Sequence, residues 1–141
     1  MKGRKRHLLV DTTGLILKAV VHAADIQDRD GGRWLVESLD LQDWPRVKRL
    51  WADGAYSGRF EDWVAERTGW IVEIVSKPPG GGFQVLPRRW VVERTFAWLG
   101  KFRRLSKDYE ALPRNEETWI YLAMTGVMLA RLACTAERMA A

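Results

Sequence analysis

The first apolar stretches of the chain have the length and spacing of two short β-strands. They run from His7 to Val10 and from Leu15 to Val21, and the turn-forming residues Asp11 to Gly14 separate them. Asp is favoured in turns because its side chain hydrogen-bonds to nearby backbone, and Gly because it adopts angles that other residues avoid. The pattern predicts a β-hairpin with Asp11 as a structural residue of its turn.

Helix and strand patterns alternate after this hairpin. An acidic first turn followed by apolar positions at helical spacing predicts a helix from Asp28 to Leu41, which Gly31 and Gly32 weaken near its start. A strand is predicted from Val47 to Ala52, and the two-residue period of a strand carries Asp53 to its end. A carboxylate at a strand tip is well placed to point into a cleft.

The second half of the chain continues the alternation. Ser57 is predicted to cap a helix over Ser57 to Arg67, and Trp70 to Val75 reads as a further strand. Lys77 to Gly82 contains prolines and consecutive glycines and is predicted to be a loop. A helical stretch follows from Trp90 to Leu105, and a last helix begins near Asn115. The predicted order is therefore β β α β α β α α.

The last predicted helix is apolar on nearly all sides from Trp119 to Leu132. Such a surface predicts burial against the sheet or against a partner chain. The longest uncharged run, Thr118 to Ala130, is shorter than the roughly 18 to 20 residues that span a bilayer. We therefore expect a soluble protein without a membrane partner.

Glu93 is the single carboxylate in the most basic predicted helix. With about 100° between successive residues, Glu93 lies at the edge of an apolar stripe, and the small Ala97 and Gly100 leave space over it. The stripe comprises Trp98, Val91, Phe102, Thr95, Leu99, Val92 and Phe96. Two interpretations are open. Glu93 either pairs with Arg89 or neighbouring bases, or joins Asp53 in holding a hard divalent cation such as Mg²⁺.

Positive charge is concentrated in two short patches. The 141 residues carry a net charge of +5, but residues 2–6 contribute +4 and residues 88–107 contribute +6, so the remainder sums to −5. Patches of this kind attract phosphate backbones. The alternatives are solvated helix faces and, for the first patch, a disordered solvated tail.

Composition limits the domain organisation and the kinds of site that the chain can form. A chain of 141 residues with 47% hydrophobic residues is expected to form one compact domain. The single Cys134 excludes an internal disulfide framework. His7 and His22 lack the spacing of metal ligands and are predicted to be structural.

Four segments of the chain carry a recognisable pattern. They are Lys2 to Thr13 (KGRKRHLLVDTT), Val21 to Gly31 (VHAADIQDRDG), Trp51 to Gly58 (WADGAYSG) and Arg88 to Glu110 (RRWVVERTFAWLGKFRRLSKDYE). Together they resemble the catalytic domain of bacterial insertion-sequence transposases of the DDE (Asp-Asp-Glu) class. The resemblance implies an RNase H-like α/β fold, with a mixed sheet flanked by helices and three acids gathered around two Mg²⁺ ions.

Individual residues match the family's functional positions. Asp53 matches the second acid and Glu93 the third, Arg89 matches the arginine four residues before that glutamate, and Lys101 falls near the lysine or arginine after it. The resemblance implies Mg²⁺, with Mn²⁺ as the alternative, and a reaction in which water and then a DNA 3′-hydroxyl attack a phosphodiester. The residues expected to contact DNA are Arg4, Lys5, Arg6, Arg89, Arg94, Lys101 and Arg104.

The first acid of the family has no counterpart in the sequence. It belongs on a central strand upstream of the stretch that matches Lys2, and Asp11 is a poor substitute because it sits in a predicted turn. We therefore expect residues 1–134 to be a catalytic domain that lacks its first central strand, followed by a tail at 135–141, with weak or no activity alone. Strand edges left unpaired would favour association.

Several expectations follow about function and partners. The expected substrates are insertion-sequence ends and target DNA, in a cytoplasmic, nucleoid-associated protein that forms homo-oligomers or assembles with an intact transposase. The alternatives are a catalytically dead DNA-binding or regulatory module, and a nuclease of the same fold. Tyr56 is expected either to lie over the site or contact DNA, or to pack in the core.

Overall fold

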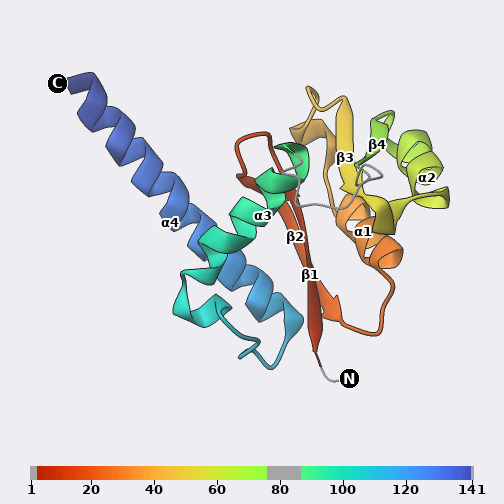
Figure 1. The fold of residues 1–141 in the computed structure, drawn as a ribbon, viewed down its shortest axis with the longest axis horizontal. Coiled ribbons are helices and arrows are strands. Elements are labelled where there is room, and N and C mark those ends of the chain that lie inside the picture. The colour runs from red at the N-terminus through yellow and green to blue at the C-terminus, as the bar shows by residue number, and fades with distance from the viewer. Residues whose placement is uncertain (1–2, 76–86, 141) are drawn as a thin grey trace, which may run out of the picture.

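A computed structural model describes residues 3–75 and 87–140 of the chain (Figure 1). Within these residues, four strands and four α-helices follow the predicted order. The elements are β1 (Arg4–Val10), β2 (Ile16–Ala23), α1 (Asp28–Glu37), β3 (Arg49–Asp53), α2 (Arg59–Thr68), β4 (Ile71–Val75), α3 (Pro87–Gly100) and α4 (Pro113–Ala140). The predicted Lys77 to Gly82 loop lies outside the described residues.

The predicted hairpin is confirmed, and its turn depends on Asp11. Strands β1 and β2 pair antiparallel, with Leu8 opposite Ala19. The carboxylate of Asp11 accepts hydrogen bonds from the backbone N–H of Thr13 at 2.8 Å and of Leu15 at 2.9 Å. These bonds fix the turn, which is the structural role predicted for Asp11.

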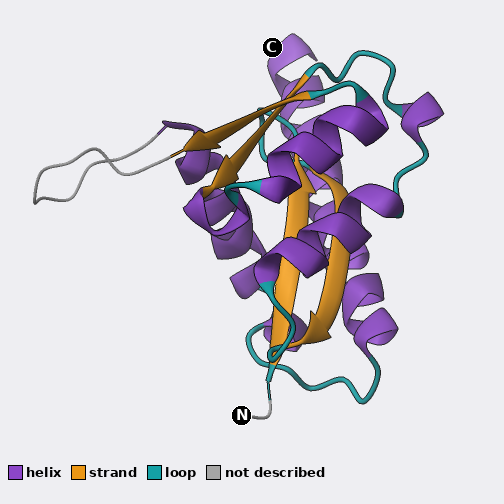
Figure 2. Cartoon of the chain, turned by 90° about the vertical axis from the view of Figure 1, so that its right-hand side faces the viewer, coloured by secondary structure: helices purple, strands orange, loops and turns teal. Residues whose placement is uncertain are grey.

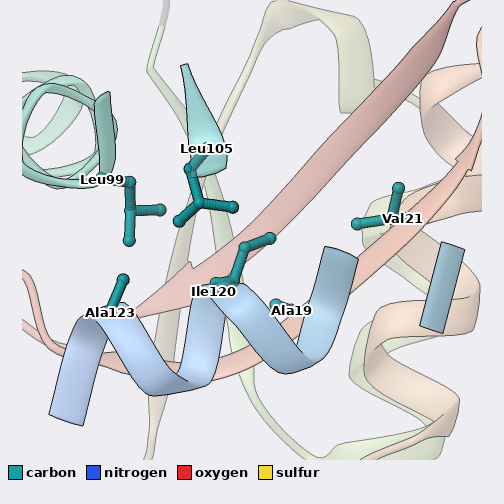
Figure 3. Close-up of a cluster of buried hydrophobic side chains, with 6 residues drawn as sticks. All are labelled: Ala19, Val21, Leu99, Leu105, Ile120 and Ala123. Carbon is teal, nitrogen blue, oxygen red and sulfur yellow. The ribbon is translucent and has the colours of Figure 1, made fainter. Parts of the chain in front are cut away.

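One face of the hairpin forms the first hydrophobic core with α3 and α4. Figure 3 shows side chains from four elements converging there. The buried residues are Ala19, Val21, Leu99, Leu105, Ile120 and Ala123. Because side chains of a strand alternate between its two faces, the opposite face of the hairpin is left for another helix. That helix is α1, which contacts both β1 and β2.

Strands β3 and β4 form a separate two-stranded sheet with its own core. They pair in parallel, with Trp51 opposite Glu73 (Figure 2). Helix α2 connects them, as a crossover between parallel strands requires. The buried side chains are Val36 of α1, Phe60 and Val64 of α2, and Trp70 just before β4. Helix α1 therefore contributes to this second core while its other side covers the hairpin.

Two adjacent glycines allow α1 to approach both neighbours closely. A Cβ atom on Gly31 would lie 2.2 Å from Nε2 of His22 and 2.5 Å from Nε2 of His7, and one on Gly32 would lie 2.7 Å from the Tyr56 ring. The two glycines, predicted only to weaken the helix, are therefore required for its packing against the hairpin and against Tyr56.

Several predicted boundaries are wrong by a few residues. Strand β1 begins at Arg4, so the disordered-tail interpretation of this basic segment is wrong. Helix α3 ends at Gly100, so Phe102 lies outside the helix and is 36% exposed. Ser57 does not cap α2. Gly58 occupies that position with φ of 93°, and its N–H donates to the Glu61 carboxylate at 2.9 Å.

Helix α4 is buried on one side only, so the predicted burial against the sheet holds for part of its apolar surface, and burial against a partner chain stays a prediction. Ile120, Ala123 and Met124 are buried, whereas Leu129 and Leu132 are 60% and 67% exposed. The helix continues to Ala140 and its second half extends beyond the rest of the molecule (Figure 1). By length and composition alone, Pro113–Met139 could also cross a membrane.

The predicted mixed α/β class is confirmed. In the described part of the chain, the strands form an antiparallel and a parallel pair that are not hydrogen-bonded to each other. The RNase H-like arrangement of a single mixed sheet, with a further central strand, therefore stays a prediction.

Replacing Gly31 with Ala should lower the free energy of unfolding by about 2–3 kcal/mol, because the new methyl group displaces two buried imidazole rings. Gly100→Ala is the matched control, since nothing lies within 4 Å of a Cβ placed there. Urea unfolding followed by circular dichroism measures both variants. Equal stability of Gly31→Ala and the wild type would show that α1 does not pack this closely.

Candidate metal and nucleic-acid site

Asp53 lies at the carboxyl end of β3, as predicted. Its Oδ1 accepts a hydrogen bond from the N–H of Ala55 at 2.9 Å and so caps a short 3₁₀ turn over Gly54–Tyr56. The side chain is half-buried at the end of a parallel strand pair. Strand ends of this kind commonly bear functional groups in α/β proteins.

A polar face of β3 surrounds Asp53. Arg49, Trp51 and Asp53 share this face because they alternate along the strand. The indole N–H of Trp51 donates to Glu73 Oε2 at 2.6 Å, and Arg49 forms an ion pair with the same carboxylate. Polar side chains held by one another in this way give the strand pair a fixed, hydrophilic surface.

The start of α3 is held against this face by a cation–π contact. The guanidinium of Arg88 lies 4.4 Å from the centre of the Trp51 ring. Sequence analysis counted Arg88 only as part of a basic patch. The dipeptide Arg88-Arg89 gave no signal that its first member would contact an aromatic side chain 37 positions earlier. The contact places the helix that carries Glu93 next to the strand that carries Asp53.

Glu93 lies on the exposed side of α3 and pairs with Arg89. Arg89 Nε lies 3.1 Å from Glu93 Oε1, and the Glu93 side chain is 56% exposed. An exposed pair four residues apart on a helix stabilises it by only a few tenths of a kcal/mol. The local pairing expected for Glu93 is therefore present, and its role with Asp53 in cation binding stays a prediction.

Tyr56 connects the Asp53 turn to the hairpin. Its hydroxyl lies 2.5 Å from Nδ1 of His7, and its ring centre is 5.3 Å from that of Phe60. Burial, together with the negative charge of Asp53, raises the pKa of Tyr56, so this hydroxyl stays protonated. Tyr56 thus packs in the core and at the same time positions the turn next to Asp53.

His7 and His22 are buried and stack on each other, with ring centres 4.7 Å apart. His22 Nδ1 donates to the carbonyl oxygen of Ala23 at 2.7 Å, since a carbonyl can only accept. Burial, and to a smaller extent the neighbouring His22, lower the pKa of His7 from its ordinary value of 6.5 to about 4. Both rings therefore behave as structural groups of the hairpin–α1 contact.

The basic residues near the start of the chain are engaged in ion pairs. Arg4 lies 3.0 Å from Asp108, Lys5 lies 2.9 Å from Asp28, and Arg6 pairs with Glu116. Their side chains are partly buried in β1. These ion pairs give the three residues a structural role. Their contact with DNA stays a prediction.

Of the basic residues on α3 and the segment after it, Arg89, Lys101 and Arg104 are exposed, whereas Arg94 is partly buried. Arg94 donates to the carbonyl oxygen of Thr13 at 2.9 Å while its guanidinium lies over Trp98. Arg104 pairs with Glu110 at 2.8 Å, and Lys101 is exposed in the turn that follows α3. These side chains lie on one segment with Arg89 and Glu93. They form the surface on which the prediction of DNA contact rests.

Asp53 and Glu93 suit a hard cation by chemistry, since Mg²⁺ prefers carboxylate oxygens, water and phosphate. Among residues 3–75 and 87–140, however, no group of three or more His, Cys, Asp or Glu side chains is placed to hold a metal ion. The two acids therefore provide at most part of such a site.

Comparison with known proteins identifies the family of the chain. The family model described as the transposase DDE domain matches residues 1–128, which include both acids and the basic segment. The chain belongs to the DDE transposase family. A protein of Burkholderia cepacia assigned as a transposase for insertion sequence element IS402 is 30% identical over 114 residues, covering 77% of this chain and 54% of that protein. This transposase-family chain spans about half the length of that relative. No solved structure matches it.

Replacing Glu116 with Gln should lower the free energy of unfolding of this transposase-family chain by about 3 kcal/mol. Glu116 is 2% exposed and faces both Arg4 and Arg6, so its neutralisation leaves two partly buried guanidinium groups without their carboxylate. Glu137→Gln, an exposed position on the same helix, is the control and should change stability by less than about 0.5 kcal/mol. Similar midpoints for both variants in urea unfolding would contradict the structural role of Arg4 and Arg6.

His7 should make the protein less stable as the pH falls. The folded-state pKa of about 4 lies below the ordinary value of 6.5, so between these values the unfolded state binds a proton that the folded state does not. The contribution is fully present above about pH 6.5 and is lost as the pH falls to about 4, and it amounts to roughly 3 kcal/mol. Urea unfolding at several pH values should show a shallower pH dependence for His7→Gln, which retains a polar group towards Tyr56. Parallel curves for the two proteins would contradict a buried neutral His7.

Proposed function

We propose that this chain forms part of the catalytic domain of a DNA transposase, in which Asp53 and Glu93 contribute carboxylates to a divalent cation site. The observation that supports the proposal is the contact of Arg88 with Trp51, which joins the start of α3, the helix that carries Glu93, to β3, the strand that ends in Asp53. Membership of the DDE transposase family supports the same assignment of the two acids.

Mg²⁺ is the proposed cation, with Mn²⁺ as the alternative. When bound, such an ion would act as a Lewis acid on a phosphodiester. The residues of the chain would position the carboxylates and bind the DNA. Asp53 is fixed by its turn, and Tyr56 holds that turn against the hairpin. Arg89, Arg94, Lys101 and Arg104 would neutralise the DNA backbone along the segment that carries Glu93.

A third carboxylate is required from another segment. The described residues contain no three-acid group, and the undescribed positions 1, 2, 76–86 and 141 contain no acidic residue. The free edges of β1 and β3 offer a place for a further strand, because β1 pairs with β2 and β3 with β4. We propose that an RNase H-like sheet is completed there by a strand outside these 141 residues. The proposed substrates are the ends of an insertion sequence and its target DNA.

A second candidate function is a DNA-binding or regulatory module without catalytic activity. The absence of a three-acid group among the described residues favours it for the isolated chain. The two functions differ in one measurable way, because a binding module holds DNA with an affinity that falls as salt rises but does not cut it.

The purified chain alone should bind DNA and show weak or no Mg²⁺- or Mn²⁺-dependent nicking of supercoiled plasmid. In an insertion element that encodes the complete protein, Glu93→Gln and Asp53→Asn should each abolish transposition, whereas Glu66→Gln on the exposed side of α2 should not. Transposition that persists in Glu93→Gln would remove the chemical basis of the proposal. Robust nicking by the isolated chain that is lost in Asp53→Ala would instead refute its dependence on a third acid.

A further inference from the structure

Two arginines from different helices converge at the turn of the hairpin. Arg94 of α3 donates to the carbonyl oxygen of Thr13 at 2.9 Å, and Arg131 of α4 donates to the same oxygen at 3.4 Å. Helices α3 and α4 lie on the same side of the hairpin, so side chains from both reach its turn (Figure 1). One neutral carbonyl oxygen thus accepts from two positively charged groups.

The indole ring of Trp98 holds both guanidinium groups in place. Its centre lies 4.9 Å from the guanidinium carbon of Arg94 and 4.5 Å from that of Arg131. The ring itself packs on the turn, since a Cβ atom on Gly14 would lie 3.0 Å from Cζ3 of Trp98. Cation–π contacts orient a guanidinium without neutralising its charge. The cluster of Arg94, Trp98 and Arg131 therefore presents two fixed positive charges.

No carboxylate neutralises this cluster in the described residues. Asp11, the acid of the turn, accepts hydrogen bonds from the N–H groups of Thr13 and Leu15 and from the Thr13 hydroxyl. Undescribed positions contain no Asp or Glu. Two like charges held together and partly shielded from water attract an anion from outside the chain. The basic residues that form ion pairs in the described part of the chain are others, namely Arg4, Lys5, Arg6, Arg49, Arg89 and Arg104.

The donors of the cluster suit a phosphate group. A guanidinium is a planar fork of N–H donors that can bind two phosphate oxygens at once. Within residues 3–75 and 87–140, the Thr13 oxygen is the one hydrogen-bond acceptor of either arginine, so further donors of both remain for a ligand. Nε of Arg94 is buried, and its terminal nitrogens are therefore the donors that a ligand can reach.

We propose that Arg94 and Arg131, held by Trp98, bind the phosphate backbone of DNA beside Glu93. This inference rests on the proposed function, because it assigns a contact with the same DNA. Arg94 follows Glu93 directly on α3, and the exposed Lys101 lies two helical turns further on, just past the end of the helix. A row of cations along one helix suits a polymer of phosphates better than a single small anion.

Arg131 is the new member of the DNA-binding surface. It lies outside both basic patches of the sequence and joins the basic segment of α3 only through the fold. A DNA strand held by the cluster would pass Glu93 and continue along α3 towards Lys101. The contact would thus position the strand at the candidate cation site without taking part in the chemistry.

Replacing Arg131 with Gln in the whole chain tests this contact. Binding of a labelled DNA duplex, measured by fluorescence anisotropy, should weaken roughly tenfold at low salt. The slope of log affinity against log salt should become shallower by about one, because fewer counterions are released. Arg131→Lys keeps the charge and should keep the wild-type slope. Arg138→Gln, at an exposed position on the same helix, is the matched control and should bind as the wild type does.

The outcomes distinguish this contact from the proposed function. Equal affinity and slope in the wild type and Arg131→Gln would overturn the contact and leave the proposed function standing, whereas a wild type that does not bind DNA would overturn both. Inorganic phosphate could instead raise the thermal unfolding midpoint of the wild type but not of Arg131→Gln, with equal DNA binding by the two. The cluster would then hold a free anion, and the proposal would be wrong.

Circular dichroism establishes that each variant is folded. If Arg131→Gln does not fold, Arg94→Gln applies the same measurement to the other arginine of the cluster, and its slope should also fall by about one. An unchanged slope in a folded Arg94→Gln would overturn the proposal.

Discussion

The close approach of α1 to its two neighbours is the packing constraint on which the candidate site depends. Gly31 lies against the stacked His7 and His22 of the hairpin, and Gly32 lies against Tyr56 and Phe60 in the layer that carries Asp53. The two strand pairs share no backbone hydrogen bond in the described residues, so the contacts of α1, together with the Tyr56–His7 contact and helix α3, determine how they sit together. The absence of a Cβ atom at Gly31 and Gly32 thus allows the close packing that positions Asp53 relative to the hairpin.

Local patterns predicted the elements well because each depends on neighbours within a few residues. The hairpin, the alternation of helices and strands, and the position of Asp53 at a strand end all follow from turn chemistry and periodicity. The end of α3 was missed because apolar residues continue to Leu105. That side chain is buried from a 3₁₀ turn and not from the helix, a distinction that periodicity does not make.

Long-range pairing explains what sequence reasoning could not foresee at the site. The basic residues of β1 appeared to be free for phosphate, but Arg4 and Arg6 meet Glu116 more than a hundred positions away. The contact between Arg88 and Trp51 has the same origin. Charge counts along a chain therefore overstate the positive surface. Of the residues predicted to contact DNA, the exposed ones are Arg89, Lys101 and Arg104, on α3 and the segment after it, where Glu93 also lies.

One side of α4 links the first strand to the helix that carries Glu93. It buries Ile120 and Glu116 in the body of the molecule, where Glu116 pairs with Arg6 of β1. Helix α4 also contacts α3, and α3 in turn contacts both β1 and β3. A change at Glu116 that loosens β1 would therefore also weaken the support of α3. The stability of the fold and the position of the basic segment on α3 thus depend on the same buried carboxylate.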